Sequence, residues 1–302
     1  MLRRIRALGT AACGVLAFVV VPAGASAATP AAPYYLALGD SLSQGVQPTP
    51  SGASVETDQG YANDLLAFER ARIPTLKLVD LGCPGDTTGS MLTGQGNSTD
   101  ARLAHCNRNG GSQLKAAELF LKAHHNRGEV PLITVDIGAN DVDGCATVPA
   151  SQIGSCVTSG VASITHDLPL ILKALRKAAP AGTTFAAMTL YDPVLGSFFS
   201  ADATQRALAA ASVPLVQQVN TNLTSTDAAS GFKTADVAGA FDTYDTTDMV
   251  SFDDQMIPVD VARVCSWTWA CTPPPSGPNI HANVNGYAVI AGAFEKVVGR
   301  LR

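Results

Sequence analysis

Short apolar runs alternate with longer segments of helical periodicity along most of this chain, and that alternation limits the choice of fold. The apolar runs cover residues 34–38, 76–81, 131–135, 184–190 and 232–237. The segments with helical spacing cover residues 61–72, 112–126, 156–179, 201–223 and 285–301. Strands that alternate with helices form a parallel sheet covered on both faces. We therefore predict an α/β fold, a three-layer α/β/α sandwich around a roughly five-stranded parallel sheet.

The first 27 residues have the pattern of a secretory signal peptide. Arg3, Arg4 and Arg6 precede a largely apolar stretch over residues 7–21, and the small residues Ala25-Ser26-Ala27 follow it. Signal peptidases cleave after such small residues. We therefore predict removal of residues 1–27 and a secreted, extracellular protein. No later run approaches the roughly 18 apolar residues of a membrane span, so we predict no integral membrane segment.

The rest of the chain is expected to form one domain. Residues 28–33 are rich in Ala and Pro and read as a flexible tether. Residues 34–302 contain neither a repeat nor a composition break, so the turn-rich stretch 242–277 is an excursion from the same domain.

Loss of three arginines with the leader takes the formal net charge from −5 to about −8. Without Lys/Arg runs, such a chain is not expected to bind nucleic acid. We expect a monomer.

Six of the seven cysteines lie beyond the predicted cleavage site. An even number of cysteines in an exported chain indicates disulfides. The six fall into three couples that are close in sequence, and we predict the pairs Cys83–Cys106, Cys145–Cys156 and Cys265–Cys271. The C-x₂-C and H-x₃-H spacings of zinc sites are missing, so we predict no metal.

The turn after the first predicted strand carries a serine that could act as a nucleophile. Ligands of open parallel sheets bind outside the carboxyl ends of the strands. Ser41 stands there, within residues 39–45 (GDSLSQG). It is not in the G-x-S-x-G elbow of α/β-hydrolases, because Ser43 replaces the second glycine. A Gly-Asp-Ser turn is also a common helix N-cap, so on its own this motif leaves both interpretations open.

Three further segments occur with this motif in a fixed order. Residues 82–88 (GCPGDTT) follow the second predicted strand, residues 138–141 (GAND) follow the third, and residues 279–287 (NIHANVNGY) lie near the end. Together the four segments resemble the four sequence blocks of the SGNH hydrolases, the GDSL-type lipases and esterases, in particular secreted bacterial ones. The resemblance spans nearly the whole mature chain and implies a flavodoxin-like SGNH hydrolase fold.

The resemblance implies a role for one residue in each block. Ser41 corresponds to the nucleophile and His281 to the general base. The backbone N–H groups of Ser41 and Gly85 and the side-chain amide of Asn140 correspond to the oxyanion hole. These types suit ester hydrolysis, because a serine hydroxyl needs a base near neutrality and the tetrahedral intermediate needs preorganised donors. No cofactor is implied.

One position departs from the family pattern. The family usually has an aspartate three residues before the histidine, and this chain has Pro278 there, followed by the uncharged Asn279. We therefore expect a Ser/His dyad in which a main-chain carbonyl of residues 276–279 holds the Nδ1–H of His281. A carbonyl can fix the same tautomer as a carboxylate. The alternative is a distant acid, for which Asp242, Asp253 and Asp254 are candidates.

Other candidate sites have simpler explanations. His105, His124, His125 and His166 lack partners at metal-ligand spacing, and the acidic residues 236–254 lack the spacing of an EF-hand loop. Trp267 and Trp269 are expected to pack within the Cys265–Cys271 loop, with a wall of the acyl pocket as the alternative.

Two rival functions have weaker support in the sequence. A flavodoxin-like nucleotide-binding domain lacks the expected G-x-G-x-x-G motif, and a secreted non-catalytic binding module is supported only by the missing aspartate. The predicted function is cleavage of carboxylic esters, with a small-molecule or lipid ester as substrate. Phospholipids and acetylated carbohydrates are the alternatives.

Overall fold

A five-stranded parallel sheet forms the centre of the protein. The computed structural model describes residues 32–95, 106 and 111–301. Its strands lie in the order β4 (Lys77–Asp80), β1 (Tyr34–Gly39), β5 (Leu132–Asp136), β6 (Thr184–Met188) and β7 (Lys233–Ala235). Every neighbouring pair is parallel. The predicted signal peptide and residues 28–31 of the predicted tether lie outside the described residues.

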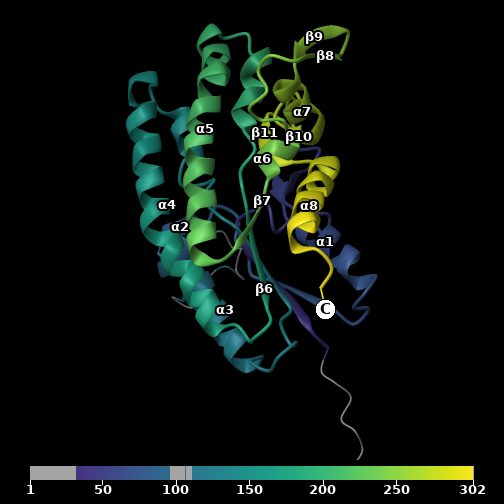
Figure 1. The fold of residues 1–302 in the computed structure, drawn as a ribbon. Helices are drawn as coiled ribbons and strands as arrows, with labels where there is room; N and C mark the ends of the chain where they lie inside the picture. The colour runs from purple at the N-terminus through teal and green to yellow at the C-terminus, as the bar shows by residue number, and fades with distance from the viewer. Residues whose placement is uncertain (1–31, 96–105, 107–110, 302) are drawn as a thin grey trace, which may run out of the picture. The chain divides into compact units, whose positions relative to one another are not determined.

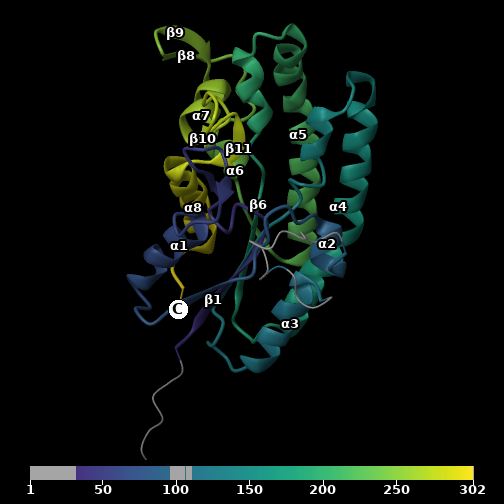
Figure 2. The ribbon, with the colours of Figure 1, turned by 180° about the vertical axis from the view of Figure 1, so that it is seen from behind.

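Helices cover both faces of this sheet. The first face carries α2 (Thr88–Thr93), α3 (Gln113–Ala123), α4 (Ala150–Ala178) and α5 (Ala203–Ser230) (Figure 1). The other carries α1 (Tyr61–Arg70) and α8 (Val284–Val298), and α6 (Val237–Ala240) and α7 (Val259–Trp267) pack against α8 (Figure 2). The predicted three-layer α/β/α sandwich is confirmed.

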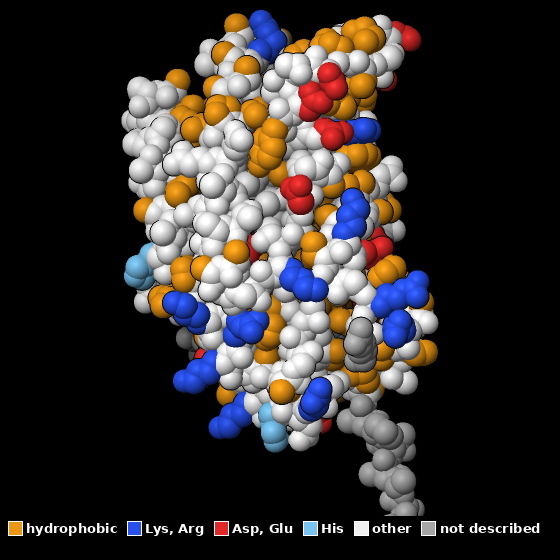
Figure 3. All heavy atoms as spheres, viewed as in Figure 1, with side chains coloured by type: hydrophobic (Ala, Val, Ile, Leu, Met, Phe, Trp, Pro, Cys, Tyr) orange, Lys and Arg blue, Asp and Glu red, His pale blue; other side chains and the backbone are white. Residues whose placement is uncertain are grey.

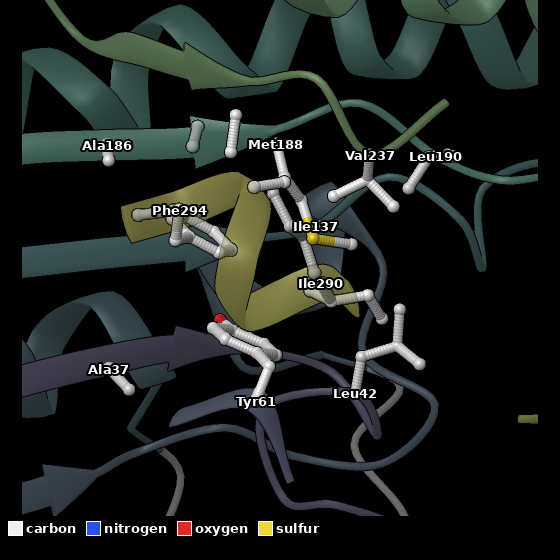
Figure 4. Close-up of a cluster of buried hydrophobic side chains, with 14 of the residues drawn as sticks. Ala37, Leu42, Tyr61, Ile137, Ala186, Met188, Leu190, Val237, Ile290 and Phe294 are labelled. Atoms are coloured by element: carbon white, nitrogen blue, oxygen red, sulfur yellow. The ribbon is translucent and has the colours of Figure 1, made fainter. Parts of the chain in front are cut away.

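The core between the sheet and the second helical layer fixes these elements in place. All five residues of β5 are buried, as expected for a central strand of a parallel sheet. The rings of Tyr61 on α1 and Phe294 on α8 stack with centroids 4.9 Å apart. Ile137, Met188 and Ile290 join them in the same cluster (Figure 4). The apolar runs of the sequence thus pack where their pattern predicts.

The elements differ most from the sequence prediction in three places. Helix α4 begins at Ala150, before the predicted start at residue 156, and α5 runs on to Ser230, past the predicted end at residue 223. The stretch 242–277 contains the hairpin of β8 (Met249–Phe252) and β9 (Gln255–Pro258) followed by α7, where only turns were expected. Polar residues dominate the end of α5, so apolar periodicity could not reveal it.

Short elements complete the edge of the sheet where the strands end. Two 3₁₀ helices follow β5 and β6, η2 (Asp143–Thr147) and η3 (Pro193–Phe199). Two small antiparallel pairs are formed by β2 (Gln47–Pro48) with β3 (Ser54–Val55) and by β10 (Thr268–Trp269) with β11 (Asn279–Ala282). The three predicted disulfides are all present: Cys83–Cys106, Cys145–Cys156 and Cys265–Cys271.

Candidate active site

The residues of the first three blocks follow three adjacent strands. Ser41 comes after β1, Gly85 after β4 and Asn140 after β5, at the carboxyl ends where ligands of open parallel sheets bind. Strand β11 brings in His281. Ser41, Asn140 and His281 line one cavity of about 90 Å³, whereas Gly85 lies in an exposed turn beside it.

The serine turn is held by a carboxylate buried beneath it. Asp136, the last residue of β5, accepts hydrogen bonds from the backbone N–H of Ser43 at 3.2 Å and from the hydroxyl of Tyr61 at 2.6 Å. Gly39 lies so close to Asp136 that a Cβ there would overlap the carboxylate. The glycine before Asp40 and Ser41 is therefore required for close packing of β1 on β5.

Asn140 joins the first two blocks. Its side-chain Nδ2 donates to the carboxylate of Asp40 at 3.2 Å and to the backbone carbonyl of Asp86 at 3.0 Å. Asp40 precedes Ser41, and Asp86 follows Gly85. The amide of Asn140 therefore lies between the backbones of Ser41 and Gly85. Neither of these two backbone N–H groups has an acceptor among the described residues.

Two side chains that the sequence analysis missed fix the spacing of these loops. Gln113, fully buried at the start of α3, accepts from the Gly39 N–H at 2.7 Å and donates to the Gly39 carbonyl at 2.8 Å and to Asp86 at 2.9 Å. Asp141 accepts from the backbone N–H and hydroxyl of Thr88 at 2.9 and 2.7 Å. A glutamine at a helix start carries no sequence signal for such a role, although Asp141 lies next to the asparagine of its block.

His281 is held by the side chain of Asn279. The Oδ1 atom of Asn279 lies 2.6 Å from His281 Nδ1 and accepts a 3.0 Å hydrogen bond from the His281 backbone N–H. An atom that accepts from a backbone N–H is an oxygen, so the amide orientation is fixed. The Nδ1 atom must then carry the proton, and Nε2 keeps the lone pair of a base. Asn279 Nδ2 donates to Ser54 Oγ at 3.2 Å, which supports the same orientation.

The expected main-chain partner of His281 is therefore wrong. Asparagine side chains readily accept from the backbone N–H two residues later, and this turn places Oδ1 beside the imidazole. The alternative acids do not reach the histidine either: Asp242 accepts from Arg263 Nε at 2.9 Å, and Asp253 and Asp254 are exposed in the β8–β9 turn. A neutral amide stands in the place of the family's aspartate.

Burial sets the charge states at the site. Desolvation lowers the pKa of His281 to about 4, so its imidazole is neutral near pH 7. Desolvation also raises the pKa of Asp40 to about 7. No hydrogen bond joins Ser41 Oγ to His281 in the described part of the chain. Catalytic hydrogen bonds are often long without substrate and tighten when it binds.

The remaining candidate residues have structural partners. The ring of His124 packs against Tyr34 and Phe120, and His166 contacts Asp167 at 2.7 Å, whereas His105 lies outside the described residues. Across residues 32–95, 106 and 111–301, no group of three His, Cys, Asp or Glu side chains is arranged to hold a metal.

The tryptophan pair does not wall the cavity. Trp267 stacks edge-on against Phe241, with ring centroids 5.1 Å apart, and Arg263 lies over its ring. Trp269 pairs with β11 as part of β10. Neither residue lines the cavity that holds Ser41 and His281. The expected packing role is therefore confirmed for Trp267, and the pocket-wall alternative is wrong for both.

Comparison with known families identifies the family of this chain. The model of the GDSL-like lipase/acylhydrolase family matches residues 37–289, which include all four blocks. The chain belongs to this family. It is accordingly a carboxylic ester hydrolase. A search of curated protein sequences returns no match.

Solved structures of this family share the fold at low sequence identity. An extracellular lipase from Streptomyces rimosus is 18% identical with a TM-score of 0.52, and the match covers 88% of this chain and 100% of the lipase. A phospholipase A1 from Streptomyces albidoflavus is 16% identical with a TM-score of 0.53, over 88% of this chain and 100% of that one. At these identities the likeness shows the fold alone.

Each helix among the described residues is too short or too polar to cross a bilayer.

Proposed function

We propose that this GDSL-family hydrolase is a secreted lipase or esterase that uses Ser41 as nucleophile and His281 as general base. The observation that carries the proposal is the 2.6 Å contact between Asn279 Oδ1 and His281 Nδ1. Asn279 holds the proton on Nδ1, so the free lone pair of Nε2 belongs to a histidine that lines the same cavity as Ser41. A base prepared in this way is what a serine hydroxyl needs for attack.

The reaction follows in two halves. Ser41 Oγ attacks the ester carbonyl as His281 Nε2 takes its proton, and the tetrahedral intermediate forms. The imidazolium then gives that proton to the leaving alkoxide, which departs as the alcohol. A water molecule, deprotonated by the same Nε2, attacks the acyl-enzyme and releases the acid and Ser41. In the imidazolium, the Nδ1–H remains hydrogen-bonded to Asn279 Oδ1, which stabilises the charge that burial disfavours.

The oxyanion is stabilised by donors from all three strand-end loops. The Ser41 and Gly85 backbone N–H groups have no acceptor among the described residues and are free to donate. Asn140 has two N–H donors, and both are occupied, by Asp40 and by the Asp86 carbonyl. One of these N–H groups must leave its present acceptor and donate to the oxyanion as negative charge develops. The bond to Asp40 is the longer of the two and is the one we expect to be exchanged.

The cavity walls support an ester with an acyl chain. Aliphatic side chains line it from the residue before η2 and from α4 and α5, among them Val142, Ile153, Val157, Leu215 and Val219. Such walls gain free energy from burying a hydrocarbon chain, at about 25 cal/mol per Å² of apolar surface. These aliphatic side chains themselves offer no hydrogen-bond partner for the hydroxyl groups of a sugar. Acyl-chain esters are therefore favoured over acetylated carbohydrates.

Secretion is supported by the leader pattern and by the three disulfides, which persist in oxidising compartments. N-terminal sequencing of the exported protein should begin at Ala28.

The test of this function is a substrate panel. Initial rates are measured on p-nitrophenyl esters from acetate to palmitate, on a diacyl phospholipid and on acetylxylan, with the Ser41→Ala variant as the blank. We expect the highest kcat/KM on p-nitrophenyl esters with an acyl chain longer than acetyl. Activity confined to acetylxylan, or equal rates for enzyme and blank on every substrate, would overturn the proposal.

A further inference from the structure

Two carboxyl groups face the cavity without a role in the proposed chemistry. Asp192, which follows β6, is fully buried, and its Oδ1 accepts from the Val194 N–H at 3.0 Å. Its Oδ2 is buried and has no hydrogen-bond partner. The nearby hydroxyl of Ser212 donates to the Ala209 carbonyl at 2.9 Å. A buried oxygen without a donor is costly unless a ligand supplies one.

Asp143 lines the same cavity from the start of η2. Neither of its carboxylate oxygens accepts a hydrogen bond from the described residues, although its backbone N–H donates to the Ala139 carbonyl. Burial, and then the charges of Asp40 and Asp192, raise its pKa to about 7. Desolvation likewise raises the pKa of Asp192 to about 6. The charge of Asp192 therefore disfavours the ionisation of Asp143.

The cavity holds no positive charge to balance them. Its other ionisable groups are Asp40, Tyr191 and His281, and none of the described lining residues is Lys or Arg. Asp40 already accepts from Leu42 and Asn140. His281 is neutral near pH 7 for the reason given above. On the face drawn in Figure 3, Lys and Arg side chains gather mainly over the lower half, away from the end where the strands finish.

We propose that Asp143 and Asp192 form a subsite for the protonated primary amine of an ester substrate, which makes ammonium-bearing esters the preferred class. The inference rests on the proposed function and deepens it. A primary ammonium has three donors, and three of the residues that line the cavity carry side-chain acceptors: Asp143, Asp192 and Ser212. A quaternary ammonium has no N–H donor and prefers an aromatic cage, whereas Tyr191 is the sole aromatic side chain among the described lining residues.

The test separates binding from turnover. Isothermal titration calorimetry at pH 7.5 compares n-butylammonium chloride, n-butanol and choline chloride. A primary amine is protonated at this pH, since its pKa is about 10. Charge-assisted hydrogen bonds predict that n-butylammonium binds at least about tenfold more tightly than n-butanol. In Asp192→Asn and in Asp143→Asn, n-butylammonium should bind less than about threefold more tightly than n-butanol. The exposed Asp58→Asn has the same change in charge and should keep the wild-type ratio.

A second measurement compares kcat/KM for p-nitrophenyl 6-aminohexanoate and p-nitrophenyl heptanoate, which differ by an ammonium in place of a methyl group. We expect the amino ester to be preferred by the enzyme and the preference to be lost in Asp192→Asn. Binding of n-butylammonium without hydrolysis of either ester would support the ammonium subsite but refute the proposed esterase activity. Hydrolysis of both esters with no preference for n-butylammonium over n-butanol would overturn the subsite, as would tighter binding of choline or an unchanged ratio in both variants.

Discussion

Replacement of Asn279 by aspartate should move the acid limb of the pH–rate profile upward. The pKa of His281 is about 4, lowered by desolvation, and Asn279 Oδ1 lies 2.6 Å from its Nδ1. A carboxylate at that position favours the imidazolium, and an opposite charge this close raises a pKa by about 1 to 3, to roughly 5 to 7. Catalysis needs neutral His281, so activity is lost as pH falls through the pKa. At pH 5, a pKa of about 4 leaves about 90% of plateau activity, and one of about 6 leaves about 10%.

The assay is kcat/KM on p-nitrophenyl butyrate from pH 4 to 8, with circular dichroism to confirm folding at each pH. Gln205→Glu, an exposed amide-to-acid change on α5, serves as the matched control and should follow the wild-type profile. An Asn279→Asp profile that coincides with the wild-type profile would refute the contact between Asn279 and His281.

Three further substitutions test the supporting contacts. Asn140→Ala should lower kcat by about a hundred- to a thousandfold with little change in KM in steady-state kinetics, because it removes a donor to the oxyanion; an effect on KM alone would make Asn140 a binding residue. Asn279→Ala should lower kcat by at least about tenfold, because the imidazole tautomer is no longer fixed, and a loss below twofold would contradict that. Gln113→Ala removes the acceptor of the buried Gly39 N–H and one donor to Asp86, so urea unfolding should show a loss of at least about 2 kcal/mol, and unchanged stability would contradict it.

The sheet and its helices were predictable because their signals are local. The inner strands β1, β5 and β6 are short and largely apolar, and α1, α3 and α8 have apolar residues at helical spacing. The hairpin and α7 within residues 242–277 were missed because each element is short, and turn-forming residues there obscure the periodicity of its apolar residues. Cysteine pairing was predictable because each pair closes a short loop.

The candidate site was predictable to the extent that four sequence blocks mark it. The blocks locate Ser41, Gly85, Asn140 and His281, but the groups that hold them depend on tertiary contacts. The side chain of Asn279 contacts His281 in place of the expected main-chain carbonyl. The spacing of the two residues in the sequence does not distinguish a side-chain contact from a main-chain contact. The cavity acids Asp143 and Asp192 are likewise invisible in sequence, because an aspartate after a strand is an ordinary loop residue until its burial is known.

Covalent labelling tests the central claim most directly. A phosphonyl fluoride reacts with a hydroxyl that a neighbouring base has activated, so peptide mass spectrometry of the treated enzyme should find one adduct, on Ser41. The adduct should be absent from Ser41→Ala, and His281→Ala should form it much more slowly. Labelling of a different serine, or full esterase activity in folded Ser41→Ala, would contradict the account.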